Sequence, residues 1–218
     1  SLTALLGPSG SGKTTLLRLL ADLDKPTSGA IAMDPPSLSN AMIFQGRSVF
    51  PWMTVRQNIG YGLKLRGTPR QEREATIASL LDIIGIAQFG SSYPHQLSEG
   101  MRQRVAIARA LAVDPDLLLM DEPFSALDEQ TKVTLQDEVL RLWERSGKTV
   151  VFITHSIDEA LVLGDRVMVM SQRPGTIRAI VPVQFPRPRN YLAVRSDPAF
   201  GEVFARIWSL LREDGATP

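Results

Sequence analysis

The sequence predicts an α/β fold in which a mostly parallel sheet forms the core and a helical subdomain is inserted into it. Three observations predict this fold. Short apolar runs of strand length recur along the chain, a glycine-rich turn joins the first run to a helical segment, and residues 46–112 show helical patterns in place of strands. Apolar runs bounded by polar residues are typical of strands that are covered on both faces, as in a parallel sheet.

The first strand is expected at residues 1–6, where "SLTALL" is a short apolar run. A glycine-rich turn follows at once, and leucines then recur at helical spacing in "TTLLRLLADL", residues 14–23. The runs "DLLLMDEP" at 116–123 and "KTVVFITH" at 148–155 are predicted to be further strands of the core.

The segment between these strands is predicted to be helical at residues 54–67, 69–85 and 101–112. Pro69 is well placed as an early helix residue, and Gly85 is a stop signal. The predicted organisation is therefore a discontinuous core, residues 1–45 and 113–218, with a helical subdomain at 46–112.

The chain returns to the core through a long helix over 127–148, which has Leu135 and Val139 on one face and Gly147 as its end. Residues 165–170 and 175–183 alternate or run apolar like late strands. The proline-rich connector "FPRPRN", residues 185–190, leads to a final helix. The apolar side of that helix contains Phe200, Val203, Phe204, Ile207 and Leu211.

The composition limits the possible functions. The 218 residues are 44% apolar, which favours a packed globular protein. Lys and Arg total 24 against 23 Asp and Glu, so we expect no nucleic acid as the principal partner. The absence of cysteine excludes disulfides, thiolate metal sites and a thiol nucleophile. No window approaches the ~20 continuous apolar residues of a membrane-spanning helix, so we expect any work at a membrane to involve docking.

A phosphate-binding pattern occupies residues 7–15, "GPSGSGKTT". It follows a predicted strand and opens a helix, which is the context that this pattern requires. The glycines let backbone N–H groups turn toward a phosphate, Lys13 places a cation at the β and γ phosphates, and Thr14 offers a hydroxyl to Mg²⁺. A glycine-rich turn without a ligand would leave Lys13 unexplained. The candidate nucleotide-binding residues are Gly7, Pro8, Ser9, Gly10, Ser11, Gly12, Lys13, Thr14 and Thr15.

Two adjacent carboxylates, Asp121 and Glu122, end the predicted strand in "LLLMDEP". Carboxylates at the end of a buried strand are costly unless a cation or a water network receives them. Asp121 suits the magnesium shell, and Glu122 suits positioning and activating the attacking water. The alternative, a pair of solvated acids, loses weight because a phosphate-binding loop lies in the same chain.

The chain resembles the nucleotide-binding subunits of ATP-binding cassette (ABC) transporters, which have a P-loop NTPase core, over essentially its whole length. Six elements carry the resemblance in order: "GPSGSGKTT", Gln45 in "MIFQG", "LSEGMRQRVAIARAL", "LLLMDEP", "SALD" at 125–128, and His155 in "FITH". The resemblance implies ATP and Mg²⁺ as cofactors and ATP hydrolysis as the activity.

The resemblance also implies a head-to-tail homodimer with ATP between the phosphate-binding loop of one copy and the "LSEGM" turn of the other. Ser98 and Gly100 would face the γ phosphate from that turn, and Asp128 would lie at the dimer seam. Gln45 would join the magnesium ligands and sense the γ phosphate, which His155 would contact. Glu122, His155 and Gln45 are therefore the candidate catalytic residues, and Thr14, Gln45 and Asp121 the candidate metal ligands.

Within the family, "FQGRSVFPWMTVRQNI" and the tail "RPGTIRAIVPVQFPRPRN" are similar to importer subunits for nitrate, aliphatic sulfonates and taurine. This similarity implies a peripheral subunit at the cytoplasmic face of the membrane, a separate permease, and indirectly an extracytoplasmic solute-binding protein. Phe50, Pro51 and Trp52 either line the groove for a permease helix or pack the helical subdomain.

The sequence departs from the family in two places. Family members carry strands before the phosphate-binding loop, with an aromatic residue that stacks on adenine, whereas this chain begins six residues before Gly7. We therefore expect N-terminal β strands to be missing, and no adenine platform is assigned. Glu99 replaces a glycine of the family turn. A carboxylate ~4 Å from a phosphate charge would cost about 4 kcal/mol at an effective dielectric near 20, so we expect Glu99 to lean outward, toward solvent or the helix's free N–H groups.

Three classes of function stay open at the level of the sequence. The first is an importer ATPase. The second is a soluble ATP-driven clamp on nucleic acid, against which the near-zero net charge and the lack of a coiled-coil insertion argue. The third is a regulatory subunit without efficient turnover; Glu122 and His155 argue against it, whereas Glu99 and the missing N-terminal strands keep it open.

Overall fold

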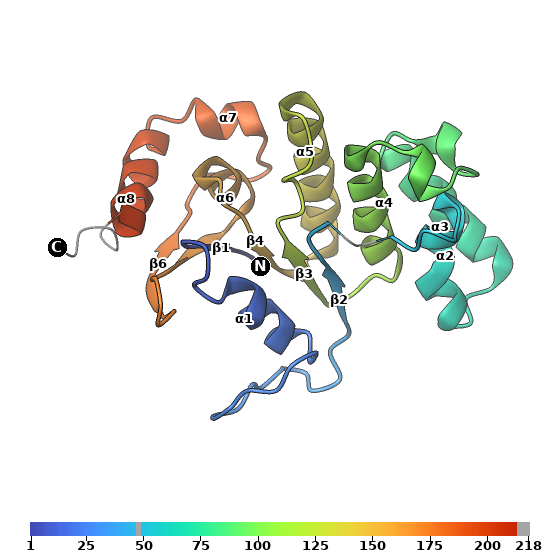
Figure 1. Cartoon of the computed structure of the whole chain (residues 1–218). Coiled ribbons are helices and arrows are strands. Elements are labelled where there is room, and N and C mark those ends of the chain that lie inside the picture. Colours follow the sequence, from blue (N-terminus) through green and yellow to red (C-terminus); the bar gives the residue numbers. More distant parts are fainter. Residues whose placement is uncertain (47–48, 213–218) are drawn as a thin grey trace.

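A six-stranded sheet forms the centre of the structure, a computed structural model that describes residues 1–46 and 49–212 (Figure 1). The spatial order of the strands is β2-β3-β4-β1-β5-β6. All neighbouring pairs are parallel except the β5–β6 hairpin, so the predicted α/β class with a mostly parallel sheet is confirmed. The strands are β1 (Leu2–Leu6), β2 (Asn40–Ile43), β3 (Leu117–Asp121), β4 (Thr149–Ile153), β5 (Arg166–Met170) and β6 (Ile177–Pro182).

Helices cover both faces of the sheet. The helix α1 lies against one face, and α5 and α6 lie against the other (Figure 1). The α-helices are α1 (Lys13–Leu20), α2 (Val55–Leu65), α3 (Arg70–Ile83), α4 (Glu99–Ala112), α5 (Glu129–Ser146), α6 (Ile157–Leu163), α7 (Tyr191–Arg195) and α8 (Phe200–Arg212), with short 3₁₀ helices at Ala87–Phe89 and Pro94–Gln96.

Apolar residues on the core strands alternate between two buried clusters, because successive side chains of a strand point to opposite faces. Leu5 of β1 and Leu119 of β3 pack with Leu17 of α1 on one face. Ala4 and Met120 belong to the larger cluster, which includes residues of α4, α5 and α6. Because the sheet is covered on both faces, its strands read as continuous apolar runs in the sequence.

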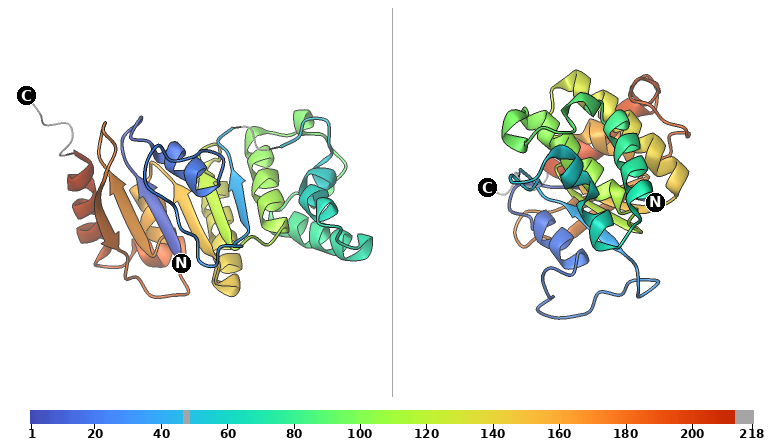
Figure 2. Two further views of the ribbon diagram at one scale, coloured as in Figure 1. Left: turned by 90° about the horizontal axis from the view of Figure 1, so that it is seen from below. Right: turned by 90° about the vertical axis from the view of Figure 1, so that its right-hand side faces the viewer.

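The helices α2, α3 and α4 pack together at one end of the sheet, and α8 lies at the opposite end (Figure 2). Two glycines of α2 permit close packing. A Cβ at Gly60 would lie 2.6 Å from Cδ1 of Ile77, and one at Gly62 would lie 2.4 Å from Cγ1 of Val113. The helical character of this region agrees with the sequence analysis, whereas its boundaries as a subdomain, 46–112, stay a prediction.

Local signals define several helix ends. Thr54 and Gln57 form a capping box at the start of α2, and the Asp128 carboxylate accepts a hydrogen bond from the Thr131 N–H at the start of α5. Gly147 ends α5 in the left-handed conformation, with φ of 65°. The sequence analysis expected one final helix, but a short helix, α7, precedes α8, because the Asn190 side chain caps an additional turn.

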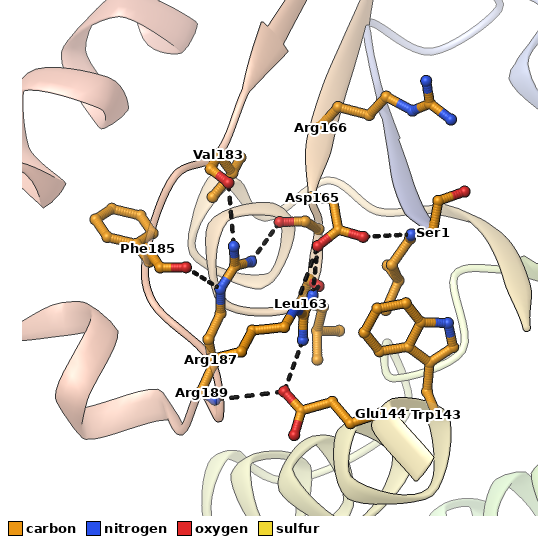
Figure 3. Close-up of polar contacts among 12 residues, drawn as sticks. Ser1, Trp143, Glu144, Leu163, Asp165, Arg166, Val183, Phe185, Arg187 and Arg189 are labelled. Atoms are coloured by element: carbon orange, nitrogen blue, oxygen red, sulfur yellow. Dashed lines mark hydrogen bonds and ion pairs between the residues drawn. The ribbon is translucent and has the colours of Figure 1, made fainter. Parts of the chain in front are cut away.

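The proline-rich connector is fixed by two arginines (Figure 3). Arg189 is buried, and its guanidinium donates to three backbone carbonyls, those of Gly164, Val183 and Phe185, at 2.6, 3.1 and 3.0 Å. Burial lowers the pKa of Arg189 to about 10. These bonds tie the connector to the sheet edge and satisfy carbonyls that would otherwise be buried without donors.

The second arginine, Arg187, joins the connector to α5. Its guanidinium contacts Asp165 at 2.7 Å and Glu144 at 2.8 Å, and it lies 4.3 Å from the centre of the Trp143 ring. Asp165 also accepts a hydrogen bond from the Leu2 N–H, so this group links the connector, α5 and the start of β1 (Figure 3).

In the described part of the chain, no helix combines the length and the apolar character that a membrane crossing requires.

Candidate active site

The loop between β1 and α1, residues 7–12, has the backbone shape of a phosphate cradle. Gly10 and Gly12 adopt φ of 79° and 91°, a region that side chains disfavour. A Cβ at Gly7 would lie 2.9 Å from the Met170 carbonyl, so only glycine fits there. Pro8 is partly buried and Ser11 buried, while Ser9 and Thr15 are exposed.

Lys13 lies under this loop. Its Nζ donates hydrogen bonds to the carbonyls of Gly7 and Pro8, both at 2.8 Å. Lys13 is only 7% exposed. Burial lowers the pKa of Lys13, and the carboxylates of Asp121 and Glu122 act in the opposite direction. The loop therefore encloses a cation that is available for an anionic ligand.

Thr14 and Asp121 meet between α1 and the end of β3. The Thr14 hydroxyl donates to Oδ2 of Asp121 at 2.9 Å. Asp121 is 4% exposed, and this burial raises the pKa of its carboxyl group, against the effect of the Thr14 hydrogen bond. The hydroxyl of Thr14 and the buried carboxylate of Asp121 thus place two oxygen atoms side by side, as in a metal-binding site.

Glu122 is held on both carboxylate oxygens. The Gln45 side-chain amide donates to Oε2 at 2.9 Å, and Nε2 of His155 lies 2.6 Å from Oε1. The strands β2, β3 and β4 are neighbours in the sheet, and they are followed by Gln45, Glu122 and His155, respectively. The three side chains therefore meet at the carboxyl ends of these strands. Glu122 itself has φ of 49°, which is uncommon for a residue other than glycine.

The turn between β5 and β6 contacts the phosphate cradle, which the sequence analysis missed. Nε of Arg173 donates to the Gly10 carbonyl at 3.3 Å. A Cβ at Gly175 would lie 1.9 Å from the Ser11 carbonyl oxygen, so two backbone segments touch there. The letters "RPG" signal a turn, but no local signal indicates that it packs against residues 10–11.

Ser98, Gly100 and Asp128 form a second group on other elements. Ser98 caps α4 by accepting from the Met101 N–H, and a Cβ at Gly100 would lie 3.1 Å from Cδ2 of Leu127. The "LSEGM" turn (residues 97–101) therefore packs beside the "SALD" segment, which Asp128 ends. The hydrogen bond of Asp128 to Thr131 lowers the pKa of Asp128.

Glu99, at the start of α4, forms an ion pair with Arg102 of the same helix. Its side chain is 53% exposed, in agreement with the expected exposure to solvent. Glu99 therefore pairs with Arg102 and not with the free N–H groups of the helix, which were the expected partners. The i,i+3 spacing of the two residues in the sequence is typical of such an ion pair.

The segment after Gln45 is partly packed among the helices and partly exposed. The Phe50 ring lies 4.9 Å from Tyr61 and 4.4 Å from the Arg109 guanidinium, so it packs among the helices. Trp52 is 69% exposed and borders a groove of about 690 Å³ that Tyr61 and Leu65 also line. Pro51 lines a separate hollow beside α4.

Comparison with known proteins identifies the family. The family model described as ABC transporter matches residues 1–125. The chain is 47% identical over 217 residues to the nitrate import ATP-binding protein NrtD of Synechocystis sp., covering 95% of the chain and 82% of the relative. It is 42% identical over 228 residues to the taurine import ATP-binding protein TauB of Roseobacter denitrificans, covering 97% and 84%.

A similar solved structure is a dimeric, post-hydrolysis state of an ATP-binding cassette bound to ADP and Pi, with a TM-score of 0.74 and 31% identity, covering 85% of this chain and 86% of that one. An uncharacterized ABC transporter ATP-binding protein of Methanocaldococcus jannaschii is 46% identical over 215 residues, which are 96% of this chain and 79% of the relative. The chain therefore belongs to the ABC transporter family and is one of its ATP-hydrolysing, nucleotide-binding subunits.

Proposed function

We propose that this ATPase subunit energises the import of a small anionic solute, such as nitrate, a sulfonate or a taurine-like compound, through a separate permease. The observation that carries the ATPase part of the proposal is the group at the carboxyl ends of β2, β3 and β4, where Gln45 and His155 hold both carboxylate oxygens of Glu122 beside the phosphate cradle. This arrangement supports turnover, and it argues against a regulatory subunit without hydrolysis.

In the proposed reaction, the loop N–H groups and Lys13 bind the β and γ phosphates of ATP. Glu122 orients the attacking water and accepts its proton, with Gln45 and His155 fixing the direction of the carboxylate. His155 would also contact the γ phosphate.

Mg²⁺ fits the donors at Thr14 and Asp121. This ion is usually bound through one or two carboxylates together with substrate phosphates, and a buried carboxylate that hydrogen-bonds a hydroxyl provides such a set. The bound ion would neutralise phosphate charge. Gln45 is the third candidate ligand, although its amide donates to Glu122 here.

Head-to-tail pairing of two copies would place Ser98 and Gly100 of one copy at the nucleotide of the other. Asp128 would lie at the seam between the copies. The close approach of Gly100 to Leu127 supports this assignment, because it brings the "LSEGM" turn and the "SALD" segment side by side. The dimeric state of the similar solved cassette supports it further.

The groove beside Trp52 is the proposed docking site for a cytoplasmic helix of the permease. Trp52 and Leu65, which line this groove, are 69% and 71% exposed, and exposed apolar patches often mark interaction sites. The proposed helical subdomain, 46–112, would transmit ATP binding to the permease. The subunit would then work peripherally, at the cytoplasmic face of the membrane, with a solute-binding protein on the other side and no nucleic acid as partner.

The similarity to the NrtD and TauB proteins supports the proposed solute class. Deletion of the gene in its host should abolish uptake of nitrate, taurine or an alkanesulfonate. The unaltered gene should restore uptake, whereas the Glu122→Gln variant should not. Unchanged uptake of all three solutes in the deletion strain would reject the proposed substrate class.

A further inference from the structure

We propose that Arg102 is a positioning residue of the "LSEGM" turn. It holds the Glu99 carboxylate in an ion pair, so that this turn can receive the nucleotide of a second copy. The inference rests on the proposed head-to-tail dimer and names what controls its assembly.

Arg102 is itself held from two sides. Its Nη1 donates to the Leu97 carbonyl at 2.8 Å and, at 3.4 Å, to that of Pro94, while Nη2 contacts the Glu99 carboxylate. The backbone bonds fix the guanidinium against the turn that precedes α4. The carboxylate therefore has a cation at a defined position, which a freely rotating side chain would not provide.

The pair borders a hollow of about 430 Å³ between α4 and the segment after Gln45. Gly46, Val49, Pro51 and His95 are among the residues that line this hollow. Among the described residues that line it, Arg102 is the one permanently charged cation. Within the described part of the chain, Arg102 is therefore the cation that compensates Glu99 on this side of α4.

An uncompensated carboxylate at residue 99 would oppose binding of a polyphosphate next to Ser98 and Gly100. The helix N-terminus offers only a partial charge, and the Ser98 side chain already accepts from the Met101 N–H. A full positive charge on Arg102 compensates the carboxylate more completely. Loss of Arg102 should therefore harm the assembly of the ATP-bound dimer because Glu99 remains.

A direct role of Arg102 at the nucleotide gives a different expectation. In that case the loss of Arg102 would weaken assembly whether or not residue 99 is charged. A purely structural role, through the Leu97 and Pro94 carbonyls, gives the same expectation. Removing the charge of Glu99 separates both alternatives from the proposal, and Glu99→Gln does so at nearly constant size.

The experiment compares four proteins in the Glu122→Gln background, where ATP-bound dimers should accumulate: the parent, Arg102→Ala, Glu99→Gln and the double variant. Sedimentation measures the dimer fraction against ATP concentration. Arg102→Ala should raise the ATP concentration for half-maximal dimerisation about tenfold, since facing like charges oppose association. In the double variant, the ATP concentration for half-maximal dimerisation should lie within about threefold of that of the parent. High salt should reduce the difference between Arg102→Ala and the parent, because salt screens the repulsion.

Arg141→Ala is the matched control, because Arg141 pairs with Glu138 at the same i,i+3 spacing on α5. It should leave dimerisation unchanged, and Arg102→Lys should fall between the parent and Arg102→Ala. Binding of ATP to the monomer should be similar in all variants. Arg102→Ala should lower the unfolding temperature slightly, and by the same amount with Glu99 or with Glu99→Gln, because the Leu97 and Pro94 carbonyls lose a donor in both cases.

A double variant as impaired as Arg102→Ala overturns the proposal, and so does an Arg102→Ala variant that dimerises like the parent. If no variant forms ATP-dependent dimers, including the parent, the proposed dimer fails and the inference fails with it. Dimerisation of the parent therefore distinguishes the two kinds of failure.

Discussion

The side-chain amide of Gln45 donates a 2.9 Å hydrogen bond to Oε2 of Glu122, although 77 residues separate the two along the chain. His155 occupies the other carboxylate oxygen at 2.6 Å. Because the three residues follow three adjacent strands, the sheet itself aligns them. A carboxylate held at both oxygens is oriented before any nucleotide binds, which reduces the cost of positioning water.

The Glu122→Gln substitution should reduce the rate of ATP hydrolysis by about 10²-fold or more, since loss of a general base typically costs 10²–10⁴-fold. ATP affinity should change little, because Lys13 and the loop remain. Phosphate release and nucleotide titration measure the two quantities. Glu129→Gln, an exposed change on α5, is the control. Equal hydrolysis by Glu122→Gln and the unaltered protein would contradict the assigned role.

The Gly175→Ala substitution should weaken ATP binding by about tenfold or more, because overpacking costs about 1–3 kcal/mol and the added Cβ would lie 1.9 Å from the Ser11 carbonyl. The cradle would have to move. Gly201→Ala has open space in α8 and should leave ATP binding unchanged. Titration with a fluorescent ATP analogue tests both. Identical affinities would show that the contact between the turn and the cradle does not matter for binding.

The Arg189→Met substitution should lower the free energy of unfolding by about 2–4 kcal/mol, because three buried carbonyls lose their donor. The side chains are similar in length, so packing is largely kept. Arg206→Met on the exposed surface of α8 should change stability by less than about 0.5 kcal/mol. Urea unfolding measures both, and a similar small effect of the two substitutions would refute the importance of the buried guanidinium.

The free energy of unfolding of the Glu159→Gln variant should increase relative to that of the unaltered protein as pH rises from acid to neutral. Burial raises the pKa of Glu159 above its ordinary 4.5, partly opposed by the Thr154 hydrogen bond. A raised pKa in the folded state contributes stability below pH 4.5, and this contribution is lost as pH rises through the folded pKa. Glutamine does not titrate. Unfolding curves from pH 4 to 8 should therefore diverge in favour of the variant, whereas a constant difference would exclude a raised pKa.

The sequence predicted β1, β3, β4, β5, β6 and the phosphate cradle because their signals are local, whereas the four-residue strand β2 was not predicted. Apolar runs mark β1 and β3, and the lysine and threonine at 13 and 14 follow glycines at fixed spacing. The roles assigned to the site residues stay predictions. What the sequence could not predict depends on contacts between distant segments, such as Gly175 against Ser11 and the burial of Arg189 in the proline-rich connector. The short helix α7 was missed because five residues are too few for a periodic signal.

The central position of β1 has a consequence for how the protein is made. Leu2 of β1 pairs with Val150 of β4, and Leu6 pairs with Val169 of β5. β1 therefore leaves the ribosome long before either of these two partners exists. At a synthesis rate of ~5–20 residues per second, the delay is roughly 8–30 s. During that interval β1 has neither of the partners that flank it in the folded sheet, so its pairing cannot be completed until residue 169 has been synthesised.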